Sequence, residues 1–217
     1  MRLRNITGSR EFIAENEFCI HNPEEIKGAW REEIFHNDHP LHLEIGMGKG
    51  VFLHTLATSN PEINYLGIEK YSSVLYRAIE KRQQTDIDNL FFLRFDATYL
   101  DTIFGPGEVD RIYLNFSDPW PKDRHAKRRL TSPQFLELYD QVLAKDGIIQ
   151  FKTDNRALFD YSVEVAENSE TWEIAEITYD LHHSDQVEGN VMTEYEKKFT
   201  ELGNPICRFV IRRAEKA

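Results

Sequence analysis

The stretch that decides the fold is L-H-L-E-I-G-M-G-K-G, residues 41–50. We expect a strand over Leu41–Ile45, a sharp turn through alternating glycines and a helix after Gly50, because glycine turns the backbone at little steric cost. The spacing G-x-G-x-G differs from the G-x-G-x-x-G of a dinucleotide site, and Glu44 would repel a pyrophosphate. A carboxylate there suits an ammonium or sulfonium ligand, although a ligand-free strand–helix turn also contains glycines of this kind.

Short apolar segments alternate with helical ones along the rest of the chain. We expect further strands over Asn64–Glu69, Leu90–Phe95, Arg111–Phe116, Gly147–Lys152, Trp172–Thr178 and Ile206–Arg212. Helices are expected over Pro23 to about Phe35, after a cap at Ser72 or Ser73, from Ser132-Pro133 to a stop at Gly147, and over Asn155–Asn168. Such alternation implies right-handed crossovers, so the sequence predicts an α/β fold with a mostly parallel sheet.

The length and composition of the chain fit one globular domain. We expect residues 1–217 to form it, with an irregular N-terminal segment over about residues 1–22. No run of about 18 apolar residues occurs and no apolar segment follows the basic start, so neither a membrane span nor a signal peptide is expected. Cys19 and Cys207 lie far apart in the sequence and fit two buried thiols in a reducing cytoplasm.

Each of the first five expected strands ends in or near an acidic residue. The five are Glu44, Glu69, Asp96, Asp118 and Asp154. In open α/β sheets ligands bind beyond the carboxyl ends of the strands, where gathered carboxylates would repel one another unless the ligand supplied cations or hydrogen-bond donors. Sulfonium, amino groups, ribose hydroxyls and the Watson–Crick edge of guanine all do so. One such acid is equally well explained by the preference of acids for helix N-termini, but five together favour a ligand.

Two of these acids suggest specific partners. Glu69 lies 23 residues after Gly46, where an acid meets the ribose hydroxyls in a nucleotide-binding α/β unit. Asp96 closes the third strand and is suited to accept a hydrogen bond from an adenine amino group. The alternatives are a surface acid before a helix for Glu69 and a turn aspartate for Asp96.

The run N-F-S-D-P-W-P-K, residues 115–122, follows the fourth expected strand directly. Its two prolines fix the backbone. An aromatic ring lies between them, flanked by the carboxylate of Asp118 and the ammonium of Lys122. This is a rigid frame with a stacking face and both charges, which suits a flat polar base. The alternative is a proline-rich turn with a core tryptophan.

The charge of the chain is unevenly distributed. The net charge is −11, which argues against non-specific binding to nucleic acid. Residues 122–129, however, carry five basic side chains and one acidic one, a local charge of +4 that leaves −15 for the rest. A small basic patch on an acidic body indicates one docking point, with an ordinary solvated face as the alternative.

Together the motifs resemble one family. E-I-G-M-G-K-G, the strand-end acids, N-F-S-D-P-W-P-K followed by K-R-R-L, and the later F-K-T-D-N and T-E-Y-E are similar to the bacterial tRNA (guanine-N7-)-methyltransferases, over about Arg31 to Arg212. The resemblance implies a class I methyltransferase, Rossmann-like fold: a mostly parallel seven-stranded sheet with an antiparallel last strand. It also implies a cytoplasmic enzyme that transfers a methyl group from S-adenosylmethionine to guanine N7 in tRNA, at the variable-loop guanosine, leaving S-adenosylhomocysteine.

The resemblance also implies roles for individual residues. Glu44, Glu69, Asp96 and Asp118 would line the cofactor site, with Asp118 as the catalytic residue. We assign Gly46 and Gly48 to the same site because glycine permits close approach of a ligand. The substrate guanosine would contact Lys122, Asp154, Thr193, Glu194, Tyr195 and Glu196, and the RNA would contact Arg124, His125, Lys127, Arg128 and Arg129.

Two weaker patterns have structural explanations. Thr193-x-x-Glu196 also spells a capping box for a helix toward Leu202, and both roles can coexist. His36, His39 and His42 are evenly spaced and His182 and His183 are adjacent. No cysteine or acid cluster completes a metal site around them, and methyl transfer needs none, so no metal is expected.

The expected chemistry needs no strong general base. Guanine N7 carries an exposed lone pair, so no proton must leave before it attacks, and the enzyme mainly has to hold the base in line with the methyl group. The purine becomes cationic as the methyl arrives, and a nearby carboxylate favours that state over the ground state. Asp118 is the first candidate for this carboxylate and Asp154 the second.

Other functions compete with this interpretation. The methyl acceptor could instead be an exocyclic amino group or a protein side chain. A nucleic-acid-binding module that keeps the cofactor but has lost turnover is a further alternative, whereas the glycine spacing disfavours a nicotinamide oxidoreductase. No obligate protein partner is evident. The sequence leaves open the choice between monomer and homodimer, which tRNAs are modified, and whether the N-terminal segment orders on RNA.

Overall fold

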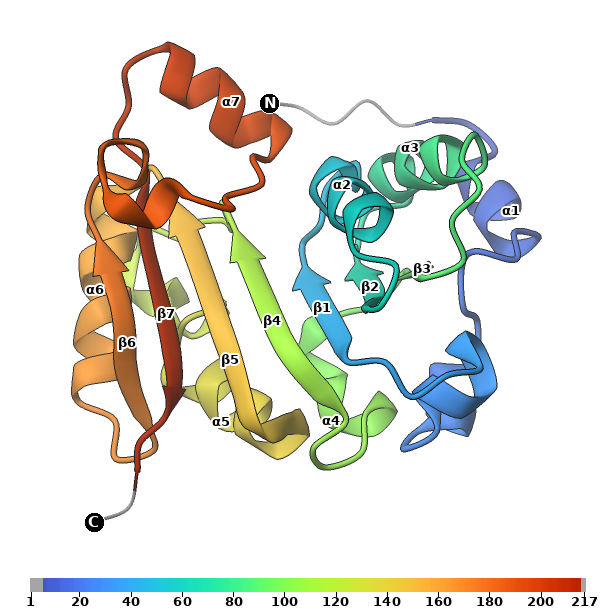
Figure 1. Ribbon diagram of the computed structural model, residues 1–217, viewed down its shortest axis with the longest axis horizontal. Helices are drawn as coiled ribbons and strands as arrows, with labels where there is room; N and C mark the ends of the chain where they lie inside the picture. The colour runs from blue at the N-terminus through green and yellow to red at the C-terminus, as the bar shows by residue number, and fades with distance from the viewer. Residues whose placement is uncertain (1–5, 216–217) are drawn as a thin grey trace.

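A single sheet of seven strands runs through the part of the chain, residues 6–215, that the computed structural model describes. The strands are β1 (Leu41–Ile45), β2 (Asn64–Ile68), β3 (Leu90–Leu93), β4 (Val109–Asn115), β5 (Leu143–Thr153), β6 (Trp172–Thr178) and β7 (Cys207–Arg213). They are ordered β3-β2-β1-β4-β5-β7-β6, as Figure 1 shows. Strands β1 to β5 pair in parallel, and β7 runs antiparallel to β5 and β6. The predicted mostly parallel sheet with an antiparallel last strand is therefore confirmed.

Helices cover both faces of this sheet. They are α1 (Ser9–Ala14), α2 (Val51–Ser59), α3 (Ser72–Arg82), α4 (Leu100–Ile103), α5 (Pro133–Val142), α6 (Arg156–Glu167) and α7 (Glu194–Glu201), with shorter turns η1 (Pro23–Ile26), η2 (Arg31–Phe35), η3 (Ala97–Tyr99), η4 (Asp123–Arg128), η5 (Leu181–His183) and η6 (Asp185–Val187). In Figure 1, α5 and α6 lie behind the sheet, α2 and α3 lie at its β1–β3 side, and α7 lies above the carboxyl ends of β4 and β5.

Alternation along the strands produces two hydrophobic clusters. Leu66 and Ile68 of β2 pack into one cluster with α5 and α6, whereas Tyr65 packs into the other with α2 and α3. The same division places Leu114 and Tyr113 of β4 in opposite clusters. Successive side chains of a strand point to opposite faces, so both faces of the inner strands are buried, as expected for a parallel sheet. Packing on both faces holds these strands in place, and with them the carboxyl edge of the sheet, where the site lies.

The predicted helix over Pro23–Phe35 is wrong, because the chain breaks in its middle. A short 3-10 turn and a short π-helical turn form instead, and Gly28 between them has φ +84°. The carboxylate of Glu108 holds this break, since it accepts hydrogen bonds from the backbone N–H groups of Gly28 and Trp30, both at 2.9 Å. A distant carboxylate therefore satisfies the donors that a continuous helix would have used internally.

Gly147 does not end the helix that begins at Pro133. That helix stops at Val142, and Gly147 lies inside β5. A Cβ atom on Gly147 would lie 2.5 Å from the Leu143 side chain and 3.0 Å from the carbonyl oxygen of Asp110. The glycine is needed for a close approach between β5 and β4 at a shift of register, and the sequence offered no means of separating this role from a helix stop.

Other predictions at the N-terminal side also need correction. Helix α3 has Tyr71 at its N-cap and no side-chain cap, so neither Ser72 nor Ser73 caps it. The segment expected to be irregular contains α1, and residues 18–20 hydrogen-bond along the edge of β3. Its first five residues lie outside the described part of the chain.

The remaining helical predictions are confirmed. Helix α6 is capped by Asn155, and α7 carries a capping box between Thr193 and Glu196. Cys19 and Cys207 are buried free thiols, as expected, and burial raises the pKa of each to about 11. Between residues 6 and 215, no helix combines the length and the apolar character that crossing a membrane requires.

Candidate active site

The strand-end acids gather at one edge of the sheet. Glu44 lies in β1, and the other four follow β2, β3, β4 and β5 in turn: Glu69, Asp96, Asp118 and Asp154. Because these five strands are parallel, their carboxyl ends all meet the upper edge in Figure 1. The structure therefore brings the predicted carboxylates to the place where open α/β sheets bind ligands.

Two hollows open at this edge. The first, called here the β2–β4 hollow, measures about 660 Å³ and is lined by Glu69, Asp96 and Asp118 among others. The second, called the α7 hollow, measures about 510 Å³ and is lined by Glu44 and by the start of α7. Gly46 and Phe116 line both, so the hollows adjoin. A larger hollow of about 850 Å³ between α5 and α6 has none of the strand-end acids in its wall and is not a candidate for the site.

Glu44 is the most perturbed acid of the site. Its side chain is buried, and its Oε1 accepts a hydrogen bond from Asn115 Nδ2 at 2.7 Å. Its Oε2 and Asn115 Oδ1 are buried with no hydrogen-bond partner among the described residues. Burial raises the pKa of Glu44 to about 8, and the charge of Glu69 adds to the effect, against the Asn115 bond and the charge of Lys152. A carboxyl that resists ionisation, with its own Oε2 and the neighbouring Asn115 Oδ1 lacking donors within residues 6–215, favours a ligand that brings donors or positive charge.

Glu69 ties the glycine turn to the start of α3. Its carboxylate accepts hydrogen bonds from the backbone N–H groups of Gly48 at 3.2 Å, Lys70 at 2.8 Å and Tyr71 at 2.9 Å. Burial raises the pKa of Glu69 above its ordinary value, and the charge of Asp118 raises it further. The repulsion expected among the gathered acids is therefore present between Glu69 and both Glu44 and Asp118.

The glycine turn leaves space beside these acids. Gly46 and Gly48 have φ +74° and +60°, conformations that other L-residues rarely adopt. A Cβ atom on either would meet nothing within 4 Å. Both glycines are therefore required by the backbone conformation, and both leave room for a ligand to approach the main chain.

Asp96 stands on the other side of the β2–β4 hollow. Its carboxylate forms an ion pair with Lys70 at 2.6 Å and accepts hydrogen bonds from Thr98. Desolvation opposes ionisation, but the Lys70 and Thr98 contacts outweigh it and lower the pKa of Asp96. Asp96 is therefore an ionised acceptor at the rim.

Asp118 lies on a turn with strained ends. The side chain is exposed and faces the β2–β4 hollow. Phe116 and Trp120, on either side of it, have φ +52° and +41°, which for bulky residues costs about 1–3 kcal/mol each. Such strain persists only where the surroundings enforce it, and it is typical of functional sites. The turn therefore holds the carboxylate in a position that the chain would not adopt alone.

The basic patch lies next to this turn, but it is smaller than predicted. Lys122, Arg124, Lys127 and Arg128 are exposed, and His125 is half-buried. No carboxylate among residues 6–215 forms an ion pair with any of these side chains. Lys127 and Arg128 also line the β2–β4 hollow, and the guanidinium of Arg128 lies 5.0 Å from the Trp120 ring centre.

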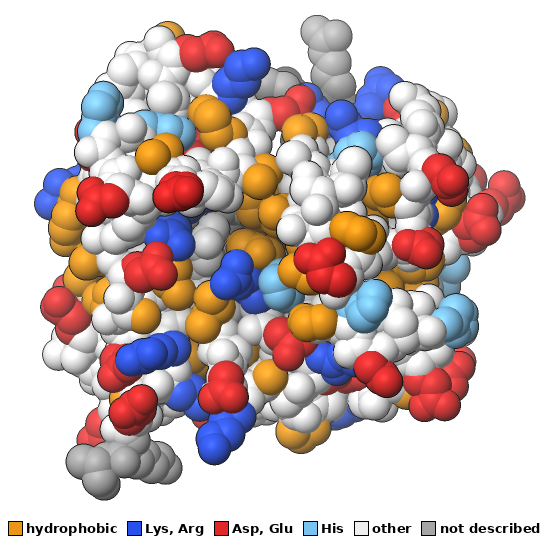
Figure 2. Space-filling model, in the orientation of Figure 1, with side chains coloured by type: hydrophobic (Ala, Val, Ile, Leu, Met, Phe, Trp, Pro, Cys, Tyr) orange, Lys and Arg blue, Asp and Glu red, His pale blue; other side chains and the backbone are white. Residues whose placement is uncertain are grey.

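Arg129 departs from the prediction. Its side chain is only 9% exposed, and its guanidinium donates to backbone carbonyls of the Asp118 turn. It is therefore not available for the phosphate contact that the sequence predicted. On the face shown in Figure 2, acidic and basic side chains are interspersed.

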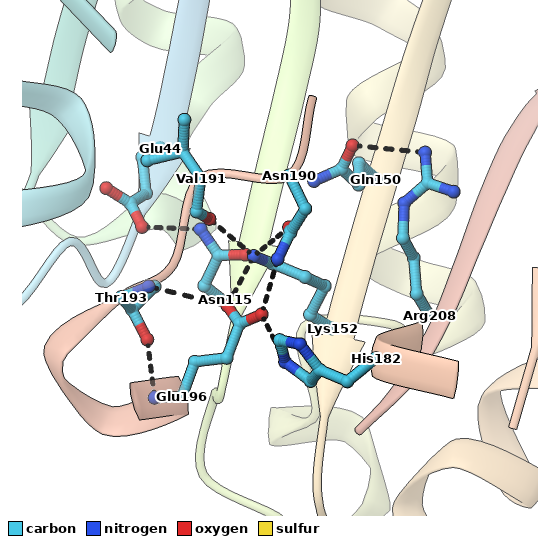
Figure 3. A network of polar contacts seen from close by, with 10 residues as sticks. All are labelled: Glu44, Asn115, Gln150, Lys152, His182, Asn190, Val191, Thr193, Glu196 and Arg208. Carbon is cyan, nitrogen blue, oxygen red and sulfur yellow. Dashed lines mark hydrogen bonds and ion pairs between the residues drawn. The ribbon is translucent and has the colours of Figure 1, made fainter. Parts of the chain in front are cut away.

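A buried ion pair holds the segment before α7 over the sheet (Figure 3). The ammonium of Lys152, on β5, is fully buried and donates to Asn190 Oδ1 at 3.0 Å, to the Val191 carbonyl at 2.9 Å and to Glu196 Oε2 at 2.6 Å. Glu196 Oε1 accepts from Asn190 Nδ2 at 2.7 Å and lies 3.2 Å from His182 Nε2. Burial lowers the pKa of Lys152 against the raising effect of Glu196.

Glu196 therefore does not face a substrate. Its side chain has no exposed surface and is absent from the wall of the α7 hollow, so the prediction that it contacts guanosine does not fit its position. Its capping box with Thr193 is confirmed. The geometry therefore favours the helix-capping role of Glu196 over a contact with the substrate.

The other predicted substrate residues divide into two groups. Thr193, Glu194 and Tyr195 line the α7 hollow, where the Tyr195 ring lies 5.0 Å from Phe116 and 4.1 Å from Phe199. Lys122 and Asp154 lie outside the walls of both hollows. Asp154 accepts a hydrogen bond from Asn204 at 3.3 Å, and its charge adds to the burial that raises the pKa of Tyr195.

Three residues of the site were not predicted from the sequence. Asn115 pairs with Glu44, Phe116 separates the two hollows, and Lys152 anchors the segment before α7. The first two belong to the N-F-S-D-P-W-P-K run, so the motif already contained their signal. Lys152 lies in a strand that is otherwise rich in buried apolar residues. A lysine in such a strand is rarely buried without a charged partner, and this was the signal that the sequence contained. No cluster of histidine, cysteine and acids able to hold a metal occurs within residues 6–215.

Comparison with known proteins gives close relatives. A family model described as "Putative methyltransferase" matches residues 38–209. A tRNA (guanine-N(7)-)-methyltransferase of Lachnoclostridium phytofermentans is 63% identical over 213 residues, which are 98% of this chain and 99% of that protein. A tRNA (guanine-N(7)-)-methyltransferase of Bacillus subtilis is 48% identical over 209 residues, covering 96% of this chain and 97% of that protein.

Solved structures with low sequence identity share the fold. A 16S rRNA methyltransferase, KamB, superposes with a TM-score of 0.64 at 14% identity, covering 85% of this chain and 92% of that chain. A mutant 16S rRNA (adenine(1408)-N(1))-methyltransferase from Catenulisporales acidiphilia, solved with its cosubstrate SAM, gives 0.60 at 9% identity, covering 91% and 93%. These likenesses show the methyltransferase fold alone.

Proposed function

Because the chain belongs to the family of tRNA (guanine-N(7)-)-methyltransferases, we propose that the two adjoining hollows are the cofactor and base sites of this reaction. The enzyme transfers a methyl group from S-adenosylmethionine to guanine N7 in tRNA and gives 7-methylguanosine. The observation that carries the assignment of the site is the convergence of Glu44, Glu69, Asp96 and Asp118 on two hollows that share a wall.

The residues of the site fit S-adenosylmethionine. The molecule carries an ammonium, a sulfonium, ribose hydroxyls and an adenine amine, and when bound it supplies an electrophilic methyl group. Glu44 Oε2 has no hydrogen-bond partner in the described part of the chain, and the acids repel one another; both features call for donors and positive charge. We assign the cationic end to Glu44, the ribose to Glu69 and the adenine amine to Asp96. The backbone of Gly46 and Gly48 admits the close approach.

Removing Glu69 should weaken cofactor binding. A Glu69→Ala variant loses charged hydrogen bonds worth about 1.5–3 kcal/mol, so its affinity for S-adenosylmethionine should fall about ten- to a hundredfold. Calorimetry on the folded variant measures this, and Glu62→Ala, an exposed acid just before β2, serves as the control. Unchanged affinity in folded Glu69→Ala would remove Glu69 from the cofactor site.

The substrate base is proposed to enter from the side of α7. Thr193, Glu194 and Tyr195 line the hollow there, and Phe116 is the wall it shares with the cofactor side. Asp118 lines the β2–β4 hollow, so the base would meet it where the two hollows adjoin. There Asp118 orients guanine by accepting from its ring N1–H and exocyclic amine, and its charge stabilises the positive charge that develops on the purine. No proton is removed by Asp118 in this scheme. Lys122 and Asp154 stay candidates for further contacts as the base is unstacked from the RNA.

The exposed basic patch is proposed to bind tRNA phosphates. Lys127 and Arg128 are exposed without an ion-pair partner in residues 6–215, next to the β2–β4 hollow, and Arg124 and His125 extend the patch. The proposed partner is tRNA, at the variable-loop guanosine that the resemblance indicates, and the proposed location is the cytoplasm, where the tRNA pool resides.

Loss of two patch cations should flatten the salt dependence of tRNA binding. Each lost phosphate contact lowers the slope of log affinity against log salt by about 0.7–0.9, so Lys127→Ala with Arg128→Ala should lower it by about twice that amount. Binding titrations over a range of salt concentrations measure the slope. Arg77→Ala with Lys145→Ala, which removes two cations outside the patch, should keep it. If the Lys127→Ala, Arg128→Ala double variant keeps the wild-type slope, the patch does not contact tRNA phosphates and is an ordinary solvated face.

A further inference from the structure

The turn that carries Asp118 has little internal support. Pro119 and Pro121 lack backbone donors, and within the described chain no backbone–backbone hydrogen bond begins or ends on residues 117–121. Phe116 at one end and Trp120 within the turn are in the left-handed region. A strained segment without its own hydrogen bonds needs an external holder to keep one conformation.

Arg129 supplies such a holder. Its Nε donates to the Pro119 carbonyl at 3.2 Å and to the Trp120 carbonyl at 3.4 Å, and its Nη2 donates to the same Trp120 carbonyl at 3.1 Å. These are the hydrogen bonds that the structure gives to residues 117–121 within the described chain. The guanidinium thereby contacts the two carbonyls that immediately follow Asp118.

The guanidinium of Arg129 is itself held in place by α6. It lies 4.2 Å from the centre of the Tyr161 ring of α6, and its side chain is 9% exposed. No carboxylate among residues 6–215 pairs with it. A buried arginine that has backbone carbonyls and an aromatic face in place of an acid is held for its geometry, since the planar fork of donors matches two acceptors at once.

We propose that Arg129 is a positioning residue for methyl transfer, which fixes the Asp118 turn through the carbonyls of Pro119 and Trp120. The inference rests on the proposed role of Asp118. It reassigns one member of the basic patch from RNA contact to control of the reacting geometry. It also explains how a bulky residue such as Trp120 keeps a left-handed conformation.

Arg129→Lys and Arg129→Ala variants together separate the two roles. Lysine keeps the positive charge but cannot present a fork to both carbonyls. A misplacement of about 1 Å in a reacting group can cost about a hundredfold in rate, so the single-turnover rate should fall by about that factor. Arg129→Ala, which removes the charge, should leave the salt slope of tRNA binding at the wild-type value, because no phosphate contact is lost. Arg77→Lys, an exposed arginine on α3, is the matched control and should keep the wild-type rate.

Two further readouts exclude a general loss of structure. In an Asp118→Asn background, Arg129→Lys should slow the enzyme little further, because residues that act as a unit are non-additive. Acrylamide quenching of tryptophan fluorescence should increase, since Trp30 and Trp172 are buried and Trp120 is partly exposed. Should Arg129→Lys fail to fold, Tyr161→Leu removes the ring behind the guanidinium and should give the same pattern at smaller amplitude.

The proposal is overturned by a folded Arg129→Lys enzyme with the wild-type rate, by a folded Arg129→Ala enzyme whose salt slope is lowered by about 0.7–0.9, as the loss of a phosphate contact requires, or by a rate loss that simply adds to that of Asp118→Asn. Failure of the proposed function is a different result. In that case the wild-type protein itself forms no 7-methylguanosine, while the quenching of Trp120 still reports whether Arg129 holds the turn.

Discussion

An Asp118→Asn enzyme should methylate tRNA about a hundred- to a thousandfold more slowly than wild type, the usual effect of losing one preorganised electrostatic contact. Asparagine keeps the shape of the side chain but not its charge, and it places an amide donor where guanine needs an acceptor. The loss should fall on the chemical step, because the carboxylate is proposed to act on charge that develops as the methyl group arrives. Affinity for tRNA should change less, since the phosphate contacts proposed for the patch are left in place.

A single-turnover assay with saturating enzyme measures this rate directly. Asp123→Asn is the matched control, because it removes one exposed acid from the segment that follows the same turn. Its rate should stay near the wild-type value. Normal methylation of guanine N7 by a folded Asp118→Asn enzyme would sink the assignment and move the role to Asp154.

A Lys152→Met variant should lose about 3–5 kcal/mol of unfolding free energy, because it leaves the carboxylate of Glu196 buried without its charge partner. Glu196 has no exposed surface, and Lys152 is the cation within 2.6 Å of it. Asn190 and Val191 also lose a donor. The segment that places α7 over the site should therefore loosen together with the rest of the fold.

Denaturant titration measures the change in unfolding free energy. Lys145→Met, an exposed lysine of the same strand, should stay within about 0.5 kcal/mol of wild type. Replacing both members of the pair, Lys152→Met with Glu196→Met, should recover a large part of the loss, because neither position then holds an unpaired buried charge. Near-normal stability of Lys152→Met alone would show that the pair does not anchor this segment.

The local patterns of the sequence were enough to predict the strands of the sheet and the acids at its carboxyl edge. Trp172–Thr178 is β6 with the predicted bounds, and Leu41–Ile45 is β1. Apolar segments of this length bounded by turns are a local signal, which tertiary contacts here did not override. Parallel strands place their end residues together by geometry, so strand positions alone were enough to group Glu44, Glu69 and Asp118.

The partner of a charged side chain is a tertiary property and could not be predicted in the same way. Arg129 belongs to a basic run that also fits a solvated face, and only its contacts with Tyr161 of α6 and with the carbonyls of the Asp118 turn direct it inward. Glu196 fits a capping box and a substrate contact equally well, until β5 brings Lys152 beneath it. Gly147 likewise gave a helix-stop signal whose meaning depended on a distant carbonyl oxygen, and the break at Gly28, which was not predicted, depends on the distant carboxylate of Glu108.

The central claim is that the enzyme methylates guanine N7 of tRNA in the acid-lined hollows. The most direct test is to incubate the purified protein with bulk tRNA and methyl-labelled S-adenosylmethionine, then to digest the RNA and separate the nucleosides. We expect label in 7-methylguanosine, lost in Asp118→Asn and kept in Asp123→Asn. Label in an N-methylated exocyclic amine, in protein, or in no nucleoside at all would contradict the claim.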